Sequence, residues 1–382
     1  MKVQKLKKNI IKVFLSEFGQ KPRLIFSPGR INLIGEHTDY NDGFTLPAAV
    51  NRGIVLGIAP SRSDISTLFA LDLDDIYKFY TSSIKTINDA HWTGYIVGVV
   101  KQLHKRGFQI PPFNMVFAGN IPIGSGMSSS AALENSVVYA LNSEFNLKLC
   151  KLEMVKISQQ AEHESVGVKC GIMDQYASMF GQKNEVLLLD CRAISSLKIP
   201  FDLKDYRLLL INTNVKHKLA ESAYNSRRTT CEYVAKQLKI KALRDASIDD
   251  LNSIKLHLYD EDFQKAKYVI EENNRVHEFT RAIEAKDFKK LGQLLYESHS
   301  GLSNMYKVSC DELDYLVDLT KGKAEILGAR LMGGGFGGCT INIIKKSYVK
   351  EFKKTTKKAY KQKFGKPCSF YKVKLNDGTR LL

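Results

Sequence analysis

The chain has 382 residues, of which 44% are hydrophobic and 25% are charged, a composition that suits a globular protein with two domains. Its seven cysteines are scattered and include no Cys-x-x-Cys pair, which argues against a disulfide-stapled secreted protein and favours a reducing compartment. No stretch approaches the roughly 20 apolar residues that a membrane span needs. We therefore expect a soluble, cytoplasmic protein.

The formal net charge is +17, and residues 345–374 are particularly rich in lysine. Such a charge raises the question of nucleic-acid binding. The lysines alternate with apolar residues as on an amphipathic helix, and no zinc-finger or RNA-binding aromatic motif accompanies them. We predict a solvated basic face that helps to attract anionic substrates, with no nucleic-acid and no membrane partner.

The first predicted elements are an amphipathic helix over residues 1–14 and a short strand over residues 24–26. Directly after the strand, residues 27–40 read SPGRINLIGEHTDY. Pro28-Gly29 and later Gly35 are expected to interrupt the strand and to turn four polar side chains into one cleft: Arg30, Glu36, His37 and Asp39. Carboxylates and an imidazole can bind vicinal hydroxyls, so the motif predicts a sugar site, with a solvated polar turn as the alternative.

Further strands are predicted at 52–59, 65–71, 76–80 and 113–118, with a helix at 92–105, which together indicate a sheet near the N-terminus. The last of these strands leads into the loop PIGSGMSSSAA at 122–132, followed by a helix that buries Leu133, Val137, Leu141 and Phe145 at fourfold spacing.

The loop at 122–132 has the composition of a phosphate-binding loop. Its glycines let backbone N–H groups approach an anion, and the dipole of the following helix favours negative charge. It is not a P-loop, because no lysine follows the second glycine, and Ser129 and Ser130 stand where the dinucleotide motif and the nucleophile elbow need glycine. A different nucleotide loop remains, and an ordinary serine-capped helix start is the alternative.

Two acidic residues further along the chain complete the candidate site. Glu162, on a helix predicted at 152–165, is the candidate carboxylate for the Mg²⁺ that accompanies ATP, although alone it would be interpreted as a surface residue. Asp174 begins an apolar helix predicted at 173–180 and needs a partner, for which Arg30 is the obvious cation. The alternative is a purely structural ion pair.

A strand at 185–190 closes the first half, and a domain boundary is predicted near residue 195, which gives domains 1–195 and 196–382. The second half restarts with a strand at 207–213 and long helices at 220–238 and 262–285. The glycine run at 331–339 lies between strand-like segments. Because glycines cost backbone entropy, the run predicts a close approach to another backbone or to a ligand, or else a tight turn.

Together these motifs resemble the GHMP kinase superfamily, named for galactokinase, homoserine kinase, mevalonate kinase and phosphomevalonate kinase. The resemblance covers essentially the whole chain: 122–132 is similar to the phosphate loop and 331–339 to the third, glycine-rich motif. Within the superfamily, 29–40 and 171–175 resemble the galactokinase signature and catalytic segment. This implies an α+β fold of two domains, with mixed or antiparallel sheets, flanking helices and the active site between the domains.

The resemblance also implies roles for individual residues. Asp174 would be the base and Arg30 would stabilise charge. The sugar would be held by Glu36, His37, Thr38, Asp39, Gly171 and Tyr224. The ATP phosphates would be wrapped by Gly124, Ser125, Gly126, Met127, Ser128, Ser129 and Ser130. Ser130 and Glu162 would be the Mg²⁺ ligands, and Met127 replaces a usual leucine at nearly constant volume.

The implied activity is transfer of the γ-phosphoryl group of ATP to the C1 hydroxyl of α-D-galactose, in galactose catabolism, by a monomer. One rival is the same chemistry on N-acetylgalactosamine or another sugar. A second is a regulator that binds galactose and ATP without catalysis. The presence of Asp174, Arg30, Ser130 and Glu162 argues against this regulator and against a purely structural protein.

Overall fold

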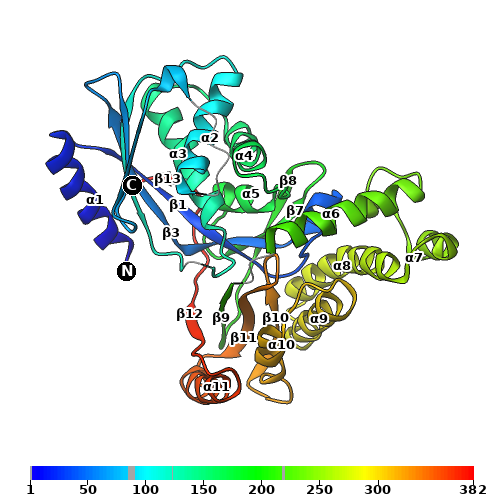
Figure 1. Ribbon diagram of the computed structural model, residues 1–382. Helices are drawn as coiled ribbons and strands as arrows, with labels where there is room; N and C mark the ends of the chain where they lie inside the picture. Colours follow the sequence, from blue (N-terminus) through cyan, green and yellow to red (C-terminus); the bar gives the residue numbers. More distant parts are fainter. Residues whose placement is uncertain (1, 85–90, 123, 217–219) are drawn as a thin grey trace.

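The computed structural model describes residues 2–84, 91–122, 124–216 and 220–382 (Figure 1). One residue of the predicted phosphate loop, Ile123, lies outside the described residues. The helices are α1 Val3–Phe18, α2 Trp92–Lys105, α3 Ser129–Phe145, α4 Lys151–Ala161, α5 Met173–Phe180, α6 Ala220–Gln237, α7 Ile248–Ser253, α8 Asp260–Glu284, α9 Phe288–Ser300, α10 Asp311–Asp318 and α11 Val349–Phe364. The strands are β1 Arg23–Asn32, β2 Phe44–Thr45, β3 Pro47–Pro60, β4 Ser66–Ala70, β5 Asp75–Phe79, β6 Phe113–Gly119, β7 Glu185–Asp190, β8 Ser195–Pro200, β9 Tyr206–Lys216, β10 Ile326–Met332, β11 Gly337–Lys345, β12 Ser369–Lys372 and β13 Arg380–Leu381.

The first sheet has the strand order β13-β1-β3-β6-β4-β5, in which the β4–β6 pair is parallel and the other pairs are antiparallel. Successive residues of a strand face opposite sides of the sheet. Ile25 of β1 therefore packs in the core with α2 to α5, whereas Leu24 and Phe26 pack against α1. The apolar stripe predicted for the first helix forms this contact through Leu6 and Ile10, which are fully buried.

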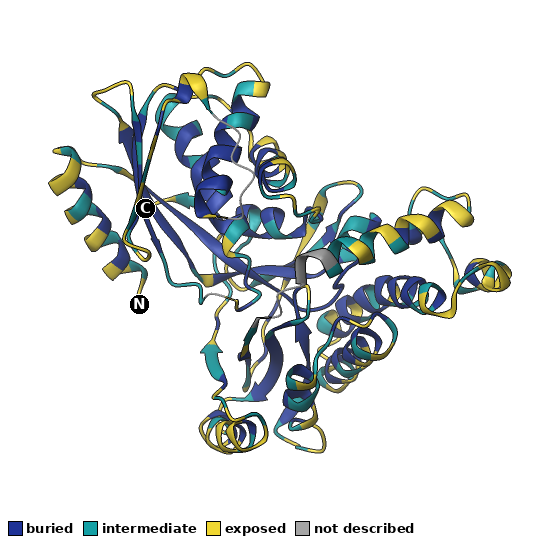
Figure 2. Cartoon of the chain, viewed as in Figure 1, coloured by how far each residue is buried: buried dark blue, intermediate teal, exposed yellow. Residues whose placement is uncertain are grey.

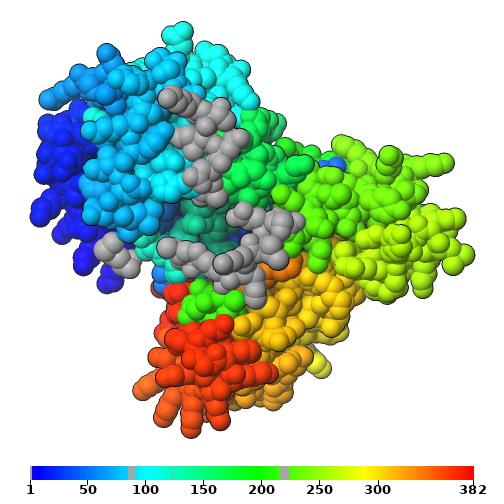
Figure 3. All heavy atoms as spheres, in the orientation of Figure 1, coloured from blue at the N-terminus to red at the C-terminus, as the bar shows by residue number. Residues whose placement is uncertain are grey.

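The second sheet has the order β10-β11-β9-β12 and is covered in the same way. Leu208 and Leu210 of β9 share a core with α8 and α9, whereas Leu209 and Ile211 share one with α10 and α11. Helix α11 is the predicted basic helix: it buries its apolar residues and leaves most of its lysines exposed (Figure 2). In the spheres of Figure 3, α11 and the second sheet lie below the lobe of the first sheet, and α6 to α8 lie to one side.

The predicted strands and helices are present in both halves, and the mixed and antiparallel sheets confirm the expected α+β fold. At β1, the expected interruption at Pro28-Gly29 is present as an irregularity, since the pairing with β3 shifts from Pro28↔Gly53 to Arg30↔Ala49. It does not end the strand, because β1 continues to Asn32. Pairing with β3 on both sides of the irregularity keeps the strand intact. Gly29 matters for another reason, because an added Cβ would lie 2.5 Å from the Met127 carbonyl oxygen.

The end of the chain returns to the first sheet. β13 pairs with β1, so the C-terminus lies in the same lobe as the N-terminal helix (Figure 1). Just before β13, the Thr379 hydroxyl is buried, 2.9 Å from the Ser27 hydroxyl and 3.0 Å from the Ser178 carbonyl oxygen to which it donates. Ser178 Oγ in turn donates to Pro28 O at 2.6 Å. The division at residue 195 stays a prediction. None of the helices in the described ranges is long and apolar enough to cross a membrane.

A close contact between α9 and β10 gives a first prediction. A Cβ on Gly292 would lie 1.9 Å from Leu327 O, and one on Gly328 would lie 2.4 Å from Gly292 O. In an open helix, Gly→Ala would stabilise by about 1 kcal/mol. Here the clash with backbone reverses the sign, so Gly292→Ala should lower the free energy of unfolding by about 1–3 kcal/mol. Urea unfolding measures this, with Lys289→Ala on the same helix as the control.

Candidate active site

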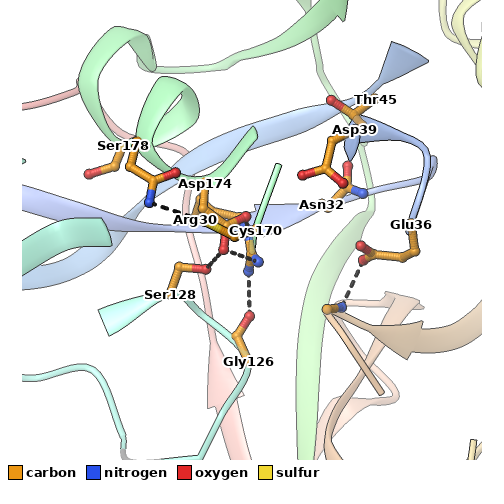
Figure 4. Close-up of polar contacts among 12 residues, drawn as sticks. Arg30, Asn32, Glu36, Asp39, Thr45, Gly126, Ser128, Cys170, Asp174 and Ser178 are labelled. Carbon is orange, nitrogen blue, oxygen red and sulfur yellow. Dashed lines mark hydrogen bonds and ion pairs between the residues drawn. The ribbon is translucent and has the colours of Figure 1, made fainter. Parts of the chain in front are cut away.

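Arg30 and Asp174 form a bidentate ion pair at the centre of the candidate site (Figure 4). Arg30 Nε donates to Asp174 Oδ1 at 2.7 Å, and Nη2 donates to Oδ2 at 2.8 Å. The Arg30 side chain is 5% exposed and that of Asp174 is 24% exposed. Arg30 lies on β1 and Asp174 in the first turn of α5, so two regular elements hold the pair. The two parallel hydrogen bonds fix the orientation of the carboxylate as well as its position.

The loop between β6 and α3 closes around the Arg30 side chain. Arg30 Nη1 donates to the Gly126 carbonyl oxygen, and the backbone N–H of Arg30 donates to Met127 O at 3.1 Å. Met127 is buried and belongs to the core that includes the second sheet, so its side chain anchors the loop instead of facing solvent. Ion pair and loop are therefore built as one unit.

The start of α3 adds hydroxyl donors to this unit. Ser128 stands at the N-cap with a left-handed backbone (φ 52°), and its hydroxyl donates to Asp174 Oδ2 (Figure 4). Ser125 is 1% exposed, and its hydroxyl has no hydrogen-bond partner in the described part of the chain. Gly124 and Ser129 lie on the surface of the same loop. A helix N-terminus beside unpaired donors is suited to binding an anion.

Two adjoining pockets meet at Arg30. One contains most of the predicted sugar-binding residues. It is lined by Arg30, Glu36, His37, Asp39, Glu162, Val168, Cys170, Met173, Asp174, Tyr224, Gly333 and Gly334. The other is lined by Arg30, Ile121, Pro122, the loop residues from Gly124 to Ser130, Gly333 and Gly334. Because Tyr224 and the two glycines come from the second half of the chain, both halves contribute to the site.

The glycine run forms the turn between β10 and β11 and packs against the loop before α3. An added Cβ on Gly126 would lie 3.1 Å from Met332 O, and one on Gly338 would lie 3.6 Å from Gly124 O. The predicted close approach of two backbones is therefore present. The N–H of Gly333 donates to Glu36 Oε1 at 2.8 Å, which links this turn to the sugar motif (Figure 4).

Glu36 is buried between the two halves of the chain. Besides Gly333, its Oε1 accepts from Arg330 Nη2 at 3.1 Å. Arg330 is itself fully buried and donates to the carbonyl oxygens of Asn32 and Leu33. Glu36 Oε2 receives neither bond and remains available in the pocket. Sequence reasoning missed Arg330, although an arginine within the apolar strand before the glycine turn was a usable signal.

Asp39 has an environment that disfavours its charge. Burial, together with the nearby carboxylates of Asp174 and Glu36, raises the pKa of Asp39 to about 7; its hydrogen bond from the Tyr40 N–H acts in the opposite direction. Gly171 does not line the pocket but is packed against Asp39, whose Oδ2 would lie 2.0 Å from an added Cβ. Gly171 therefore positions the carboxylate by lacking a side chain.

His37 lies in an aromatic group above the same pocket. Its ring centre is 5.3 Å from that of Tyr224 and 4.9 Å from that of Tyr306, and its Nδ1 is 2.8 Å from the Tyr40 hydroxyl. Burial lowers the pKa of His37 to about 3, so its imidazole is neutral at physiological pH. Thr38 does not line the pocket. Its buried hydroxyl lies 2.9 Å from Gly35 O and 2.6 Å from Phe44 O, which is a structural role.

Helix α8 holds the backbone of this motif through three side chains. Tyr268 donates its hydroxyl to Glu36 O at 3.1 Å. Glu272 Oε1 accepts from Gly35 N at 2.9 Å, and Asn273 Oδ1 accepts from Phe44 N at 2.9 Å. Both ends of the segment that carries the polar side chains are therefore fixed by one helix of the second half. Nothing in the local sequence of α8 identified these residues.

Glu162 and Ser130 provide oxygen atoms of the kind that Mg²⁺ prefers. Glu162 begins the π-helical turn Glu162–Val166 and is buried, although it had the pattern of a surface residue. Gln175 Nε2 donates to Glu162 Oε2 at 2.6 Å. Burial and the neighbouring Asp174 raise the pKa of Glu162 to about 7, while hydrogen bonds from Ser130, Cys170 and Gln175 act against this rise. A buried carboxylate short of positive charge is a fitting environment for a divalent cation.

A second carboxylate beside Glu162 was also missed. Glu134 of α3 is fully buried and shares the Gln175 side chain, whose Nε2 is 3.3 Å from Glu134 Oε2. Burial and the adjacent Glu162 raise the pKa of Glu134 well above its usual range. Glu134 directly follows Leu133 of the predicted buried helix face, but the sequence prediction did not include Glu134 in that face.

Comparison with known proteins agrees with this geometry. Family profiles match at residues 12–60 (galactokinase galactose-binding signature), 94–182 (GHMP kinases N terminal domain) and 279–362 (GHMP kinases C terminal). A galactokinase of Thermotoga neapolitana is 42% identical over 354 residues, which cover 93% of this chain and 98% of that protein. One of Clostridium tetani is 37% identical over 387 residues, with 99% and 97% covered.

Solved structures give the same result. The galactokinase of Lactococcus lactis, complexed with galactose, superposes with a TM-score of 0.92 at 33% identity and covers 97% of this chain and 98% of its own. The mevalonate kinase of Methanococcus jannaschii has a TM-score of 0.67 at 19% identity over 94% and 99% of the chains, which shows a shared fold.

Fold, loop and ion pair thus define a small-molecule phosphotransferase of the GHMP kinase class. Its members use ATP. Within that class, the extent and identity of the matches show that the chain belongs to the galactokinase family of sugar kinases.

The contact between Gly171 and Asp39 yields a prediction for sugar binding. Gly171→Ala places a methyl group on the Asp39 carboxylate and must displace it. Because displacements of about 1 Å in a site can cost about 10²-fold, we expect the KM for sugar to rise at least tenfold. The KM for ATP should change little, since Gly171 does not line the second pocket. Steady-state kinetics with each substrate varied in turn measures both; equal effects on the two would contradict this assignment.

The raised pKa of Asp39 yields a prediction for stability. A carboxyl with a higher pKa in the folded than in the unfolded state makes the protein less stable as pH rises through the interval between the two values, here about pH 4 to 7. Asp39→Asn removes this penalty and keeps an acceptor for the Tyr40 N–H. The variant should therefore gain a few degrees in Tm relative to the ligand-free natural chain at pH 8 and little at pH 4.5. Calorimetry at both pH values tests the sign.

Proposed function

We propose that the chain transfers the γ-phosphoryl group of ATP to the C1 hydroxyl of α-D-galactose, producing galactose 1-phosphate and ADP. The observation that carries this proposal is the position of the Arg30–Asp174 pair between the two pockets. The first pocket, which contains most of the predicted sugar-binding residues, is called the sugar-type pocket below, and the second is lined by the loop before α3. The galactokinases to which the chain is similar, including one solved with galactose, support the choice of sugar.

Asp174 is the proposed base. A carboxylate has about four acceptor sites. Arg30 Nε occupies one on Oδ1, while Arg30 Nη2 and the Ser128 hydroxyl occupy two on Oδ2. One site on Oδ1 is left for the hydroxyl of a sugar in the pocket that Asp174 lines. The fixed carboxylate can thus accept the C1 hydroxyl proton without changing its other contacts.

Arg30 is the proposed charge stabiliser. Its guanidinium has five N–H bonds, and the described contacts to Asp174 and Gly126 use three of them. Two remain, and the side chain lines both pockets. A buried, always charged group at this position would stabilise negative charge that develops on the transferred phosphoryl group. The N–H groups of residues 124–130 would hold the other phosphate oxygens.

Mg²⁺ would be held by Glu162 and the Ser130 hydroxyl, with the phosphates supplying further oxygen ligands. Bound there, it would neutralise phosphate charge. Gln175 orients Glu162 through the 2.6 Å hydrogen bond described above. Glu36, His37, Asp39 and Tyr224 are proposed to contact the sugar hydroxyls, since all four line the first pocket.

The remaining parts of the proposal concern the setting of the enzyme. We propose a cytoplasmic monomer that binds no nucleic acid. The seven free cysteines support a reducing compartment, and the solvated lysine face of α11 accounts for much of the positive charge without a nucleic-acid partner. N-acetylgalactosamine kinase activity is the main rival, because it would use the same pair and loop.

ADP release with ATP and Mg²⁺ is the test, comparing galactose, N-acetylgalactosamine, glucose and no sugar. Asp174→Asn should reduce kcat by about 10²–10⁴-fold and leave galactose binding by calorimetry nearly unchanged. Asp245→Asn is the matched control, because Asp245 also forms a bidentate pair, with Arg192 at 2.7 Å and 2.7 Å, but lines neither pocket. Substantial turnover by Asp174→Asn would remove it from the role of base, and preference for another sugar would change the substrate.

Arg30→Lys tests whether turnover needs only the positive charge at residue 30 or also the two parallel hydrogen bonds that Arg30 donates to Asp174. Lysine keeps the positive charge but cannot form the two parallel bonds to Asp174. We expect kcat to fall by at least about 10²-fold while the KM values change less, because the lost interactions are needed most in the transition state. Stopped-flow single-turnover measurements isolate the chemical step. A variant with nearly normal turnover would show that charge alone suffices.

A further inference from the structure

A chain of hydrogen bonds leads from the sugar-type pocket into the core of the second half. His37 Nδ1 lies 2.8 Å from the Tyr40 hydroxyl, and that hydroxyl lies 2.8 Å from the hydroxyl of Tyr306. The Tyr306 hydroxyl also lies 3.3 Å from Cys231 Sγ, on α6. These groups come from three separate segments of the chain: the His37–Tyr40 contact is local, and tertiary structure adds Tyr306 and Cys231.

His37, at one end of this series of hydrogen bonds, is the member that belongs to the pocket. His37 lines that pocket, is 3% exposed and has a left-handed backbone (φ 63°) that fixes the direction of its side chain. Its Nε2 is buried and has no close hydrogen bond to the described residues, although the backbone of Gly334, which also lines the pocket, interacts with the imidazole and raises its pKa against the effect of burial. Because the imidazole is neutral, only one of its two nitrogens carries a proton, and the partner of Nδ1 decides which one.

The number of protons on these groups determines which group donates in each hydrogen bond of the series. Burial raises the pKa values of Tyr40 and Tyr306 well above their usual range and that of Cys231 to about 11, so all three keep their protons. The Tyr306 hydroxyl can donate either to the Tyr40 oxygen or to the Cys231 sulfur. Oxygen is the better acceptor, since thiol sulfur accepts weakly. Tyr306 therefore donates to Tyr40, and the Tyr40 hydroxyl is left to donate to His37 Nδ1.

We infer that Tyr40 and Tyr306 are positioning residues that fix His37 as its Nε2–H tautomer, so that His37 donates a hydrogen bond to an oxygen of the bound sugar. The inference rests on the proposed function, because it takes the pocket to hold the sugar. The opposite direction would require Tyr306 to donate to sulfur and would turn Nε2 into an acceptor.

The direction matters for recognition of the substrate. Glu36 and Asp39 present carboxylate oxygens to the same pocket and act as acceptors when they are ionised. A sugar hydroxyl is both donor and acceptor. One that donates to a carboxylate can still accept from His37 Nε2–H, whereas an Nε2 without a proton would leave only acceptors beside it. A sugar lacking that hydroxyl would leave the buried Nε2–H with only the Gly334 backbone beside it, which is a basis for discrimination.

The tautomer can be observed directly in the ligand-free full-length protein. Long-range ¹H–¹⁵N spectra of the chain labelled at histidine distinguish a protonated from an unprotonated ring nitrogen, and the spectrum of His37→Gln assigns the signals of His37. We expect a protonated Nε2 and an unprotonated Nδ1. A protonated Nδ1, or an equal mixture of the two forms, would overturn the inference.

Kinetics tests the two tyrosines. Tyr306→Phe and Tyr40→Phe remove the hydroxyl and keep the ring, so the KM for galactose should rise about tenfold while the KM for ATP stays within about twofold. Tyr296→Phe is the matched control, because its hydroxyl is also partly buried and lies 2.9 Å from Thr320 Oγ1, outside both pockets. Equal changes in the KM values for galactose and ATP would indicate a merely structural role for the hydroxyls.

Two variants of Cys231 keep the test decisive if a tyrosine variant fails to fold. Cys231→Ala removes the sulfur and leaves the direction unchanged, so the His37 tautomer should stay as it is. Cys231→Ser provides a competing oxygen acceptor, so a second tautomer should appear. If both variants retain a single Nε2–H form, the choice between oxygen and sulfur does not set the direction, and this inference fails.

The inference and the proposed function fail in different ways. Absence of galactose-dependent ADP release by the natural chain would contradict the function, whatever the tautomer. An Nδ1–H tautomer in a chain that does phosphorylate galactose would contradict only the inference.

Discussion

The structure of the site depends on one buried charge, the guanidinium of Arg30. Removing one partner of a buried ion pair typically costs about 3–5 kcal/mol, so the protein must supply the partners of such a charge before any ligand arrives. Here they are the Asp174 carboxylate and the Gly126 carbonyl oxygen. The continuation of β1 past its irregularity at Pro28-Gly29, the missing side chain of Gly29 and the buried side chain of Met127 all serve to bring the loop onto this arginine. The same contacts that stabilise the fold thus place Asp174, the proposed base, next to the loop between β6 and α3.

Around this pair the protein concentrates more negative than positive charge. Asp39 and Glu162 both have pKa values raised to about 7, chiefly because they are buried. The unliganded site is therefore electrostatically unfavourable, and ligands that supply hydroxyl donors or a cation relieve the imbalance. In the proposed function these acids serve the sugar and the Mg²⁺, whereas the phosphates would meet backbone N–H groups and Arg30.

Local sequence patterns predicted most of the regular elements. The predicted helices over 92–105 and 173–180 and the strand over 185–190 coincide with α2, α5 and β7, because their periodicity and their ends are set by nearby residues. Pro28-Gly29 produces an irregularity and not an end of the strand, because pairing with β3 on both sides holds β1 together, and this pairing cannot be seen in the local sequence.

Of the residues in the candidate site, some were found from local sequence patterns and others were not. Arg30 and Asp174 were paired from sequence, because an acid among apolar residues requires a partner and Arg30 was the obvious cation. Arg330, Glu134 and Tyr306 were not found, because their roles arise from contacts with residues far away in the chain. Thr38 lay within a correctly identified motif, but a motif does not reveal which of its side chains face inward.

The last residues of the chain lie directly behind the ion pair. Thr379 contacts Ser27 and Ser178, which precede Arg30 by three residues and follow Asp174 by four. Three segments that lie far apart in the sequence therefore meet in one buried cluster of hydroxyls, in which Ser27 and Ser178 also contact each other at 3.1 Å. A buried hydroxyl that loses its partner costs about 1–3 kcal/mol. Detachment of β13 would therefore weaken the support of the two elements that carry Arg30 and Asp174, so the order of the site is coupled to the pairing of β13 with β1.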